Sequence, residues 1–142
     1  MRLSGLIFVV EDDPVTAIVT ELFVKRNEEW SGEVQHFSDG QHAFDHLLLA
    51  LAQQGPLPDL ILLDLNMPFM DGWDFLDAYA GLVGAPKIPV FLLTSSIRPQ
   101  DMERSRTYDS VKGYFSKPLD DAKVAQMARL LDADCAPTGK TP

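Results

Sequence analysis

Five short apolar runs, each of strand length, alternate along this chain with longer segments of helical character. The runs are LIFVV (6–10), EVQHF (33–37), LILL (60–63), VFLL (90–93) and VKGYF (111–115). Continuous apolar runs that alternate with helices are typical of a mostly parallel sheet that is covered by helices on both faces. Because crossover connections are right-handed, few topologies remain. We expect an α/β fold of the (βα)5 type, a doubly wound five-stranded sheet in the order 2-1-3-4-5.

Helical spacing appears as four apolar stripes between and after these runs. The stripes are Val15, Ile18, Val19, Leu22 and Phe23; Phe44, Leu47, Leu48 and Leu51; Phe75, Leu76, Tyr79, Leu82 and Val83; and Val124, Met127, Ala128 and Leu131. Segment 100–108 is mostly polar, with Met102 as its main apolar anchor, and predicts only a marginal helix. The length suits one domain, which we place at 1–132, and segment 133–142 is expected to fray as a disordered tail.

Composition narrows the class of protein. The net charge is −9 and the pI is about 4.6, which argues against a basic nucleic-acid-binding face and against binding to anionic membranes. Cys135 is the one cysteine, so no internal disulfide forms and a reducing, cytoplasmic location is expected. No apolar run reaches the length of a membrane span, and the N-terminus does not read as a signal peptide.

Polar residues follow four of the apolar runs directly. Glu11 and Asp12 follow the first run, Asp64 the third and Thr94 the fourth, and Lys117 comes just after the fifth. In an open α/β sheet, ligands bind outside the carboxyl ends of the strands. The sequence therefore predicts that these five side chains form one site.

Clustered carboxylates repel each other, by about 4 kcal/mol for a pair about 4 Å apart near the surface, and so require a cation. The predicted ligands are all oxygens, which favour Mg²⁺, Mn²⁺ or Ca²⁺ over zinc. Mg²⁺ characteristically combines few carboxylates with phosphate oxygens. We therefore expect a Mg²⁺ site, with Mn²⁺ as an alternative, that supports phosphoryl chemistry. Asp64 is the best candidate for a nucleophile that becomes an aspartyl phosphate, with Lys117 and Thr94 as charge and hydroxyl donors.

Four motifs complete this picture: VVEDDP (9–14), DLNMPFMDG (64–72), LLTSS (92–96) and KP (117–118). Together, over about residues 3–131, they resemble the receiver domain of two-component response regulators, the CheY-like family. The resemblance implies that Asp64 is phosphorylated by a sensor histidine kinase. It also implies that Asp12 and Asp64 bind Mg²⁺, that Glu11 acts mostly through water, and that the backbone carbonyl of Asn66 completes the ligands.

The same resemblance implies a switch. Thr94 is expected to contact the phosphoryl oxygen together with Lys117, and Tyr114 to move inward when Thr94 moves. The Lys117–Pro118 peptide is expected to be cis. Leu65 and Ser96 occupy positions that set the phosphoryl lifetime in the family. The surface of the fourth helix, fifth strand and fifth helix would then change its affinity for a partner.

The resemblance leads us to expect a stand-alone receiver, monomeric or weakly dimeric, that catalyses its own phosphorylation and dephosphorylation but is a signalling switch rather than an enzyme. Its expected partners are a sensor histidine kinase or a histidine phosphotransfer protein, and an unknown downstream protein. The alternative function is a relay intermediate that passes the phosphoryl group to a histidine phosphotransfer domain. A remote alternative, an aspartyl-nucleophile phosphatase, would need a second acid two residues after Asp64, where Asn66 stands. A flavin-binding protein of this fold would need a Ser/Thr/Gly-rich loop instead of Glu11–Asp13.

Several other polar residues have simpler interpretations. Asp13, next to Pro14, is expected to cap a helix rather than to bind metal. His42 and His46 are four residues apart on a helix but are expected to lie on a solvated face. Trp73 is expected to pack at the start of a helix, and His36 to be a packing or surface residue.

Overall fold

The structure is a computed structural model that describes residues 5–27, 30 and 32–135. Its strands are β1 (Leu6–Val10), β2 (Glu33–Phe37), β3 (Leu60–Leu63), β4 (Val90–Thr94) and β5 (Val111–Ser116). Its helices are α1 (Pro14–Arg26), α2 (Gly40–Gln53), α3 (Gly72–Ala80), α4 (Pro99–Ser105) and α5 (Asp121–Cys135). Strand and helix alternate five times, so the predicted fold class is confirmed.

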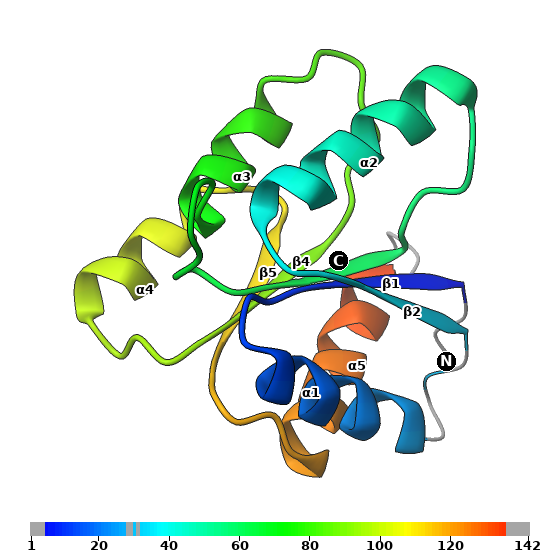
Figure 1. The fold of residues 1–142 in the computed structure, drawn as a ribbon. Helices are drawn as coiled ribbons and strands as arrows, with labels where there is room; N and C mark the ends of the chain where they lie inside the picture. The colour runs from blue at the N-terminus through cyan, green and yellow to red at the C-terminus, as the bar shows by residue number, and fades with distance from the viewer. Residues whose placement is uncertain (1–4, 28–29, 31, 136–142) are drawn as a thin grey trace.

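The five strands form one parallel sheet in the order β2-β1-β3-β4-β5 (Figure 1). The register aligns the ends of the central strands, because Val10 pairs with Leu63, and Leu63 pairs with Leu92. At the other side of the site, Thr94 pairs with Ser116. The residues that follow these strands are therefore brought to one edge of the sheet.

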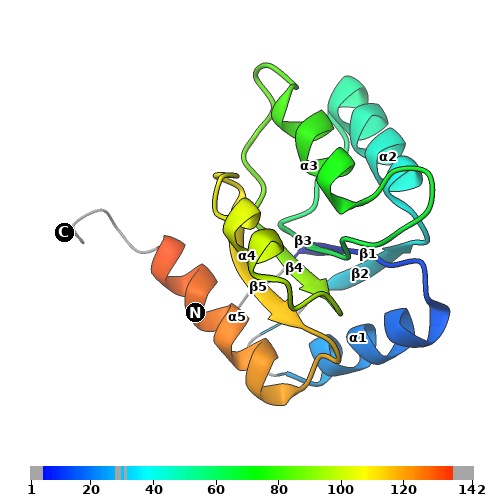
Figure 2. The same ribbon diagram turned by 90° about the vertical axis from the view of Figure 1, so that its left-hand side faces the viewer.

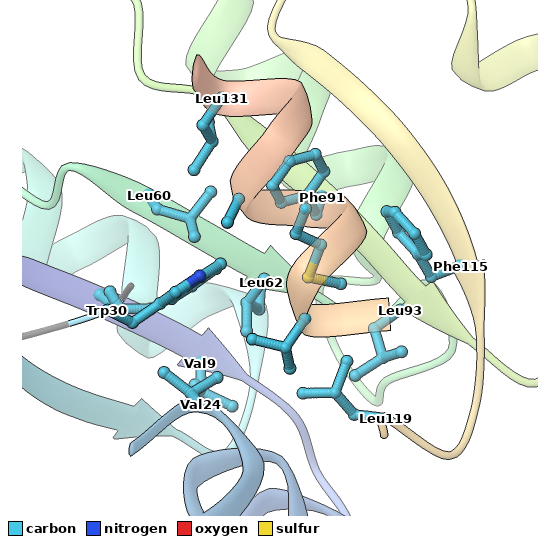
Figure 3. Packing of buried hydrophobic residues seen from close by; sticks show 14 residues of the cluster. Val9, Val24, Trp30, Leu60, Leu62, Phe91, Leu93, Phe115, Leu119 and Leu131 are labelled. Carbon is cyan, nitrogen blue, oxygen red and sulfur yellow. The ribbon is translucent and has the colours of Figure 1, made fainter. Parts of the chain in front are cut away.

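The sheet separates two apolar layers. Helices α2 and α3 cover one face, and α1 and α5 cover the other (Figures 1 and 2). Figure 3 shows the second layer, in which side chains from β1, β3 and β4 pack against α1 and α5 around Phe91 and Leu62. Because both faces are covered, β1, β3 and β4 are almost entirely buried, which explains their continuous apolar sequences.

Helix α1 is rotated away from the orientation that its apolar stripe predicted. Val15, Ile18 and Leu22 are 60–67% exposed, whereas Ala17 and Val24 are buried, together with Thr20. The predicted stripe was therefore wrong for Val15, Ile18 and Leu22, whereas Phe23 of the same stripe is partly buried and packs against the core. Residues 15 and 17 lie about 200° apart around a helix, so the buried side at Ala17 is nearly opposite to the exposed side at Val15.

Two other helices differ from their predicted extent. Helix α3 ends at Ala80, so Leu82 and Val83 lie beyond it, and Val83 is fully exposed. Helix α4 spans only seven residues and buries Asp101 and Ser105, while Met102 is 40% exposed. The marginal character of segment 100–108 is confirmed, but Met102 is not its anchor.

At the C-terminal end, α5 extends to Cys135, three residues into the segment that was expected to fray, and residues 136–142 lie outside the described residues. Among the helices of the described residues, none has both the length and the apolar character needed to cross a membrane.

Candidate functional site

Three carboxylates meet at the carboxyl edge of the sheet. Glu11 and Asp12 follow β1, Asp64 follows β3, and each offers an oxygen within 4.8 Å of the other two. Glu11 and Asp64 are both 3% exposed, whereas Asp12 is exposed. The predicted convergence of these acids is therefore present in the structure, and Asp12 faces the solvent side of the cluster.

Lys117 lies between two of these acids. Its Nζ is 2.7 Å from Oε1 of Glu11 and 3.1 Å from Oδ2 of Asp64. Burial alone would lower the pKa of Lys117, but the hydrogen bonds to Glu11 and Asp64 outweigh it and raise that pKa above its ordinary value. The ammonium group is therefore charged and compensates part of the negative charge of the site.

Glu11 has an unusual acidity in this setting. Burial raises its pKa from 4.5 to about 7; the hydrogen bond from Lys117 opposes this rise, and the charge of Asp64 adds to it. The backbone N–H of Asp13 also donates to Oε2 of Glu11 (3.1 Å). Near neutral pH the carboxyl group of Glu11 is thus divided between its protonated and ionised forms.

Thr94 and Tyr114 belong to one hydrogen-bonded chain. Thr94 is fully buried at the end of β4, and its Oγ1 accepts a hydrogen bond from the backbone N–H of Ser96 (3.2 Å). The hydroxyl of half-buried Tyr114 donates to the carbonyl of Ser96 (2.9 Å). Ser96 Oγ in turn donates to Asp101 of α4 (2.6 Å). Ser96 therefore connects Thr94, Tyr114 and α4.

Backbone hydrogen bonds fix the segments that carry Thr94, Lys117 and Asp64. Lys117 N–H donates to the carbonyl of Thr94 (2.9 Å), which joins the ends of β4 and β5, and the Lys117–Pro118 peptide is cis. On the other side, Gly72 N–H donates to the carbonyl of Leu65 (3.0 Å) and closes the loop that follows Asp64. A Cβ on Gly72 would lie 2.6 Å from the carbonyl oxygen of Asp64, so only glycine fits there.

Asp13, Asn66 and His42, which the sequence analysis also considered, do not belong to the cluster of carboxylates. Asp13 accepts a hydrogen bond from Thr16 N–H (3.0 Å) as the N-cap of α1, which confirms its capping role. Asn66 is exposed, and its N–H donates to Oδ1 of Asp64 (3.3 Å). His42 is exposed on α2, where its Nδ1 lies 2.7 Å from Oδ2 of the capping residue Asp39.

Two neighbours of the site escaped the sequence interpretation. His36 of β2 places Nε2 2.7 Å from the carbonyl oxygen of Glu11 and helps to hold that residue. Asp101 of α4 binds both Ser96 and Arg98 and is buried. His36 could have been recognised from its position near the end of its strand, whereas no local pattern in the sequence pointed to Asp101.

This arrangement fits a hard divalent cation. Within the described residues, the acidic cluster consists of oxygen donors alone, the donor set that Mg²⁺ and Mn²⁺ prefer. Glu11, Asp12 and Asp64 would hold the ion. When bound, such an ion neutralises charge on a transferring phosphoryl group.

Comparisons with known proteins agree with this geometry. The family profile of the response regulator receiver domain matches residues 7–129. A probable methanogenesis regulatory protein of Methanothrix harundinacea, FilR2, is 32% identical over 114 residues, which are 80% of this chain and 72% of that protein. Six further curated relatives are longer, and the chain spans between 34% and 61% of their lengths.

Two solved structures are similar throughout. The phosphorylated cyanobacterial phytochrome response regulator RcpA has a TM-score of 0.72 and 27% identity, covering 93% of this chain and 92% of that one. The Mn²⁺-bound form of the response regulator Rcp1 has a TM-score of 0.70 and 27% identity, covering 96% and 98%. The topology, the edge site and the matched family profile lead to one conclusion: the chain belongs to the response regulator receiver family of two-component signalling.

Proposed function

We propose that the chain is a phosphorylation-dependent switch in which Asp64 accepts a phosphoryl group from a phosphohistidine protein. The observation that carries this proposal is the position of Lys117 between Glu11 and Asp64, beside exposed Asp12. A buried nucleophilic carboxylate, a metal-binding acid and a fixed ammonium group then surround one point. Phosphoryl transfer depends mainly on such positioning and charge neutralisation.

In the proposed reaction, a carboxylate oxygen of Asp64 attacks phosphorus and forms an acyl phosphate. The bond between phosphorus and the donor's imidazole nitrogen breaks, and the imidazole leaves with the electron pair of that bond. Lys117 keeps a positive charge near the transferring group and holds Asp64 in position. The hydroxyl of Thr94, at the end of the neighbouring strand β4, would donate a hydrogen bond to a phosphoryl oxygen.

The signal would travel through Ser96. If the Thr94 hydroxyl turns toward a phosphoryl oxygen, it no longer accepts the hydrogen bond from Ser96 N–H. The segment that carries Ser96 is bonded to Tyr114 and to Asp101 of α4, so all three can change together. Helix α4 buries two polar side chains and no hydrophobic one, which makes it an element of low local stability. We therefore propose that α4 and β5 form the responsive surface.

Incubation with Mg²⁺ and acetyl phosphate tests this function directly. Intact-mass spectrometry should show the gain of one phosphoryl group by the wild-type chain, and no gain when the metal is chelated. A complex with beryllofluoride, a stable analogue of the acyl phosphate, covers the case of rapid hydrolysis. If the wild-type chain neither gains mass nor binds beryllofluoride, it is not a phosphoryl acceptor.

The acidity of Glu11 predicts how metal binding depends on pH. With its pKa near 7, metal binding must displace a proton, and apparent Mg²⁺ affinity should rise about tenfold from about pH 6 to about pH 8. Without metal, the free energy of unfolding changes with pH in the opposite direction to the metal affinity. Between pH 4.5 and 7 the carboxyl group of Glu11 holds a proton in the folded chain that it has lost in the unfolded chain. Stability of the metal-free protein should therefore fall as pH rises from 4.5 to about 7 and should level off above that pH.

Calorimetric Mg²⁺ titrations across this pH range would measure the effect. The variant Glu11→Gln has no titratable group at this position and should lose most of the pH dependence. A dependence that remains unchanged in Glu11→Gln would assign it to another residue.

A cluster between α3 and α4 gives a second readout. The Arg104 guanidinium lies 4.5 Å from the centre of the Trp73 ring, and Tyr108 stacks on the same ring at 5.9 Å. The Tyr108 hydroxyl donates to Asp77 of α3 (2.6 Å). If α4 shifts, the environment of Trp73 must change, so beryllofluoride with Mg²⁺ should alter the tryptophan fluorescence.

The matched control is Trp73→Phe, which leaves only Trp30, a buried residue of the core on the other face of the sheet. The fluorescence response should disappear in this variant. Arg104→Ala should lower the free energy of unfolding by about 0.5–1 kcal/mol, the size of an exposed cation–π contact. A full response in Trp73→Phe would show that the fluorescence change comes from Trp30 and not from the cluster between α3 and α4.

A further inference from the structure

Phe69 has an unusual backbone conformation in the loop that follows the acceptor aspartate. Its φ is +68°, and Met70 N–H donates to the carbonyl of Pro68 (2.8 Å), two residues back. These two features define a γ-turn of the rare, strained kind, with Phe69 at its centre. For a bulky side chain, positive φ is a genuine outlier, and glycine or asparagine would adopt it at lower cost.

The residues around Phe69 are held firmly. Met67 is buried on one side, and on the other Asp71 caps α3 with a reciprocal capping box. A Cβ on Gly40 of α2 would lie 2.6 Å from the carbonyl oxygen of Met70, so the loop is pressed against α2. The surroundings thus impose the strained turn, and strain of this kind marks functional positions.

The aromatic ring of Phe69 does not contribute to the stability of the fold. Phe69 is 93% exposed, so it makes almost no packing contact within the chain. A large side chain that is both strained and exposed must be explained by something outside the folded chain. An exposed aromatic residue on a rigid loop is the type of side chain that anchors protein contacts.

Other exposed apolar side chains surround the same edge of the sheet. Val15, which begins the first turn of α1 with Pro14, is 66% exposed, and Ile97, which follows β4, is 78% exposed. With Phe69 after β3, three segments that leave the carboxyl ends of the strands each carry an exposed apolar side chain, at the edge of the sheet where Asp64 lies. A donor histidine on another protein must approach the Asp64 carboxylate from this edge.

We propose that Phe69 is a specificity-determining contact for the phosphohistidine protein that phosphorylates Asp64. Its ring packs against apolar surface next to the donor histidine, and Val15 and Ile97 extend the contact. A small donor such as acetyl phosphate has no surface to place against the ring. This inference rests on the proposed function, because it names what distinguishes the protein donor at the same site.

The experiment compares two classes of donor. The histidine kinases and phosphotransfer domains of the source organism are labelled from radioactive ATP, and the one that transfers fastest to the wild-type chain is taken as the protein donor. Transfer rates from this donor and from acetyl phosphate are then measured for Phe69→Asn and Phe69→Tyr. Val83→Ser is the control, since Val83 is equally exposed but lies beyond the other end of α3.

For Phe69→Asn, the ratio of kcat/KM with the protein donor to that with acetyl phosphate should fall at least about tenfold. Phe69→Tyr should restore the ratio, and Val83→Ser should not change it. Relief of strain should raise the melting temperature of Phe69→Asn by about 2–5 °C, which separates lost contact from lost folding.

An unchanged ratio in Phe69→Asn would overturn the inference, and so would an equal loss with both donors. Failure of acetyl phosphate and of every protein donor to label the wild-type chain would instead overturn the proposed function.

Discussion

The variant Asp64→Asn should gain no phosphoryl group from acetyl phosphate under conditions that label the wild-type chain completely. Asparagine keeps the shape of the side chain, and so its packing at the end of β3, but an amide does not provide the nucleophilic carboxylate. It also removes one of the two acids that contact Lys117. Intact-mass spectrometry of the two proteins, treated side by side with Mg²⁺, measures the difference.

The matched control is Asp13→Asn, which removes a charge from the same edge of the sheet. Asparagine caps helices as well as aspartate does, so α1 should be unaffected. This variant should be labelled like the wild type. Labelling of Asp64→Asn would mean that another carboxylate is the acceptor, and loss of labelling in Asp13→Asn would mean that the total charge matters more than one nucleophile.

The variant Phe91→Ala should lose about 3–5 kcal/mol of unfolding free energy. Phe91 is fully buried in β4, and its ring meets that of Phe115 edge-on, with the ring centres 5.6 Å apart. A Cβ on Gly113 would come within 3.1 Å of the Phe91 ring, so the ring is also packed closely against β5. Since domains of this size are stable by only about 5–15 kcal/mol, the variant should be close to unfolding.

Equilibrium denaturation in urea would measure this loss. Leu49→Ala is a suitable control, because Leu49 is 54% exposed on α2 and its truncation should change stability by less than about 0.5 kcal/mol. Losses of similar size in both variants would contradict the assignment of the core to the two layers beside the sheet.

The sheet and most of the acidic site could be predicted because both depend on pattern rather than on side-chain detail. A run such as LILL has no polar residue to expose, so it must be buried on both faces, and its end is marked by Asp64. Once the strands are parallel, Glu11 and Asp64 must meet at one edge. Lys117 follows the same rule from the last strand.

The orientation of α1 could not be predicted in this way. Its inward face contains Ala17 and Thr20, which are small and allow close contact with β1 and α5. The larger Ile18 and Leu22 lie outside, although any hydrophobicity scale would place them inside. The rotation of the helix depends on where Asp13 and Pro14 start it and on the space between α1, β1 and α5. The pattern of apolar residues in the sequence contains no information on either.

Networks that join distant side chains were also beyond prediction. Ser96 is one of several polar residues in the loop after β4, yet it joins Thr94, Tyr114 and Asp101 by hydrogen bonds. These contacts depend on backbone positions in three different elements. A motif can mark Thr94, but it does not reveal which atoms follow its movement.

The close approach of Gly72 to the backbone of Asp64, the proposed acceptor, limits how the loop between them can evolve. The loop is closed by the hydrogen bond from Gly72 N–H to Leu65, and its last residue touches the main chain of Asp64. An insertion or deletion between these residues would move Asp64 itself, whereas a change of side chain at an exposed position would not. The exposed positions of the loop can therefore vary in composition but the loop cannot vary in length, so substitutions there can change the surface of this edge while Asp64 stays in place.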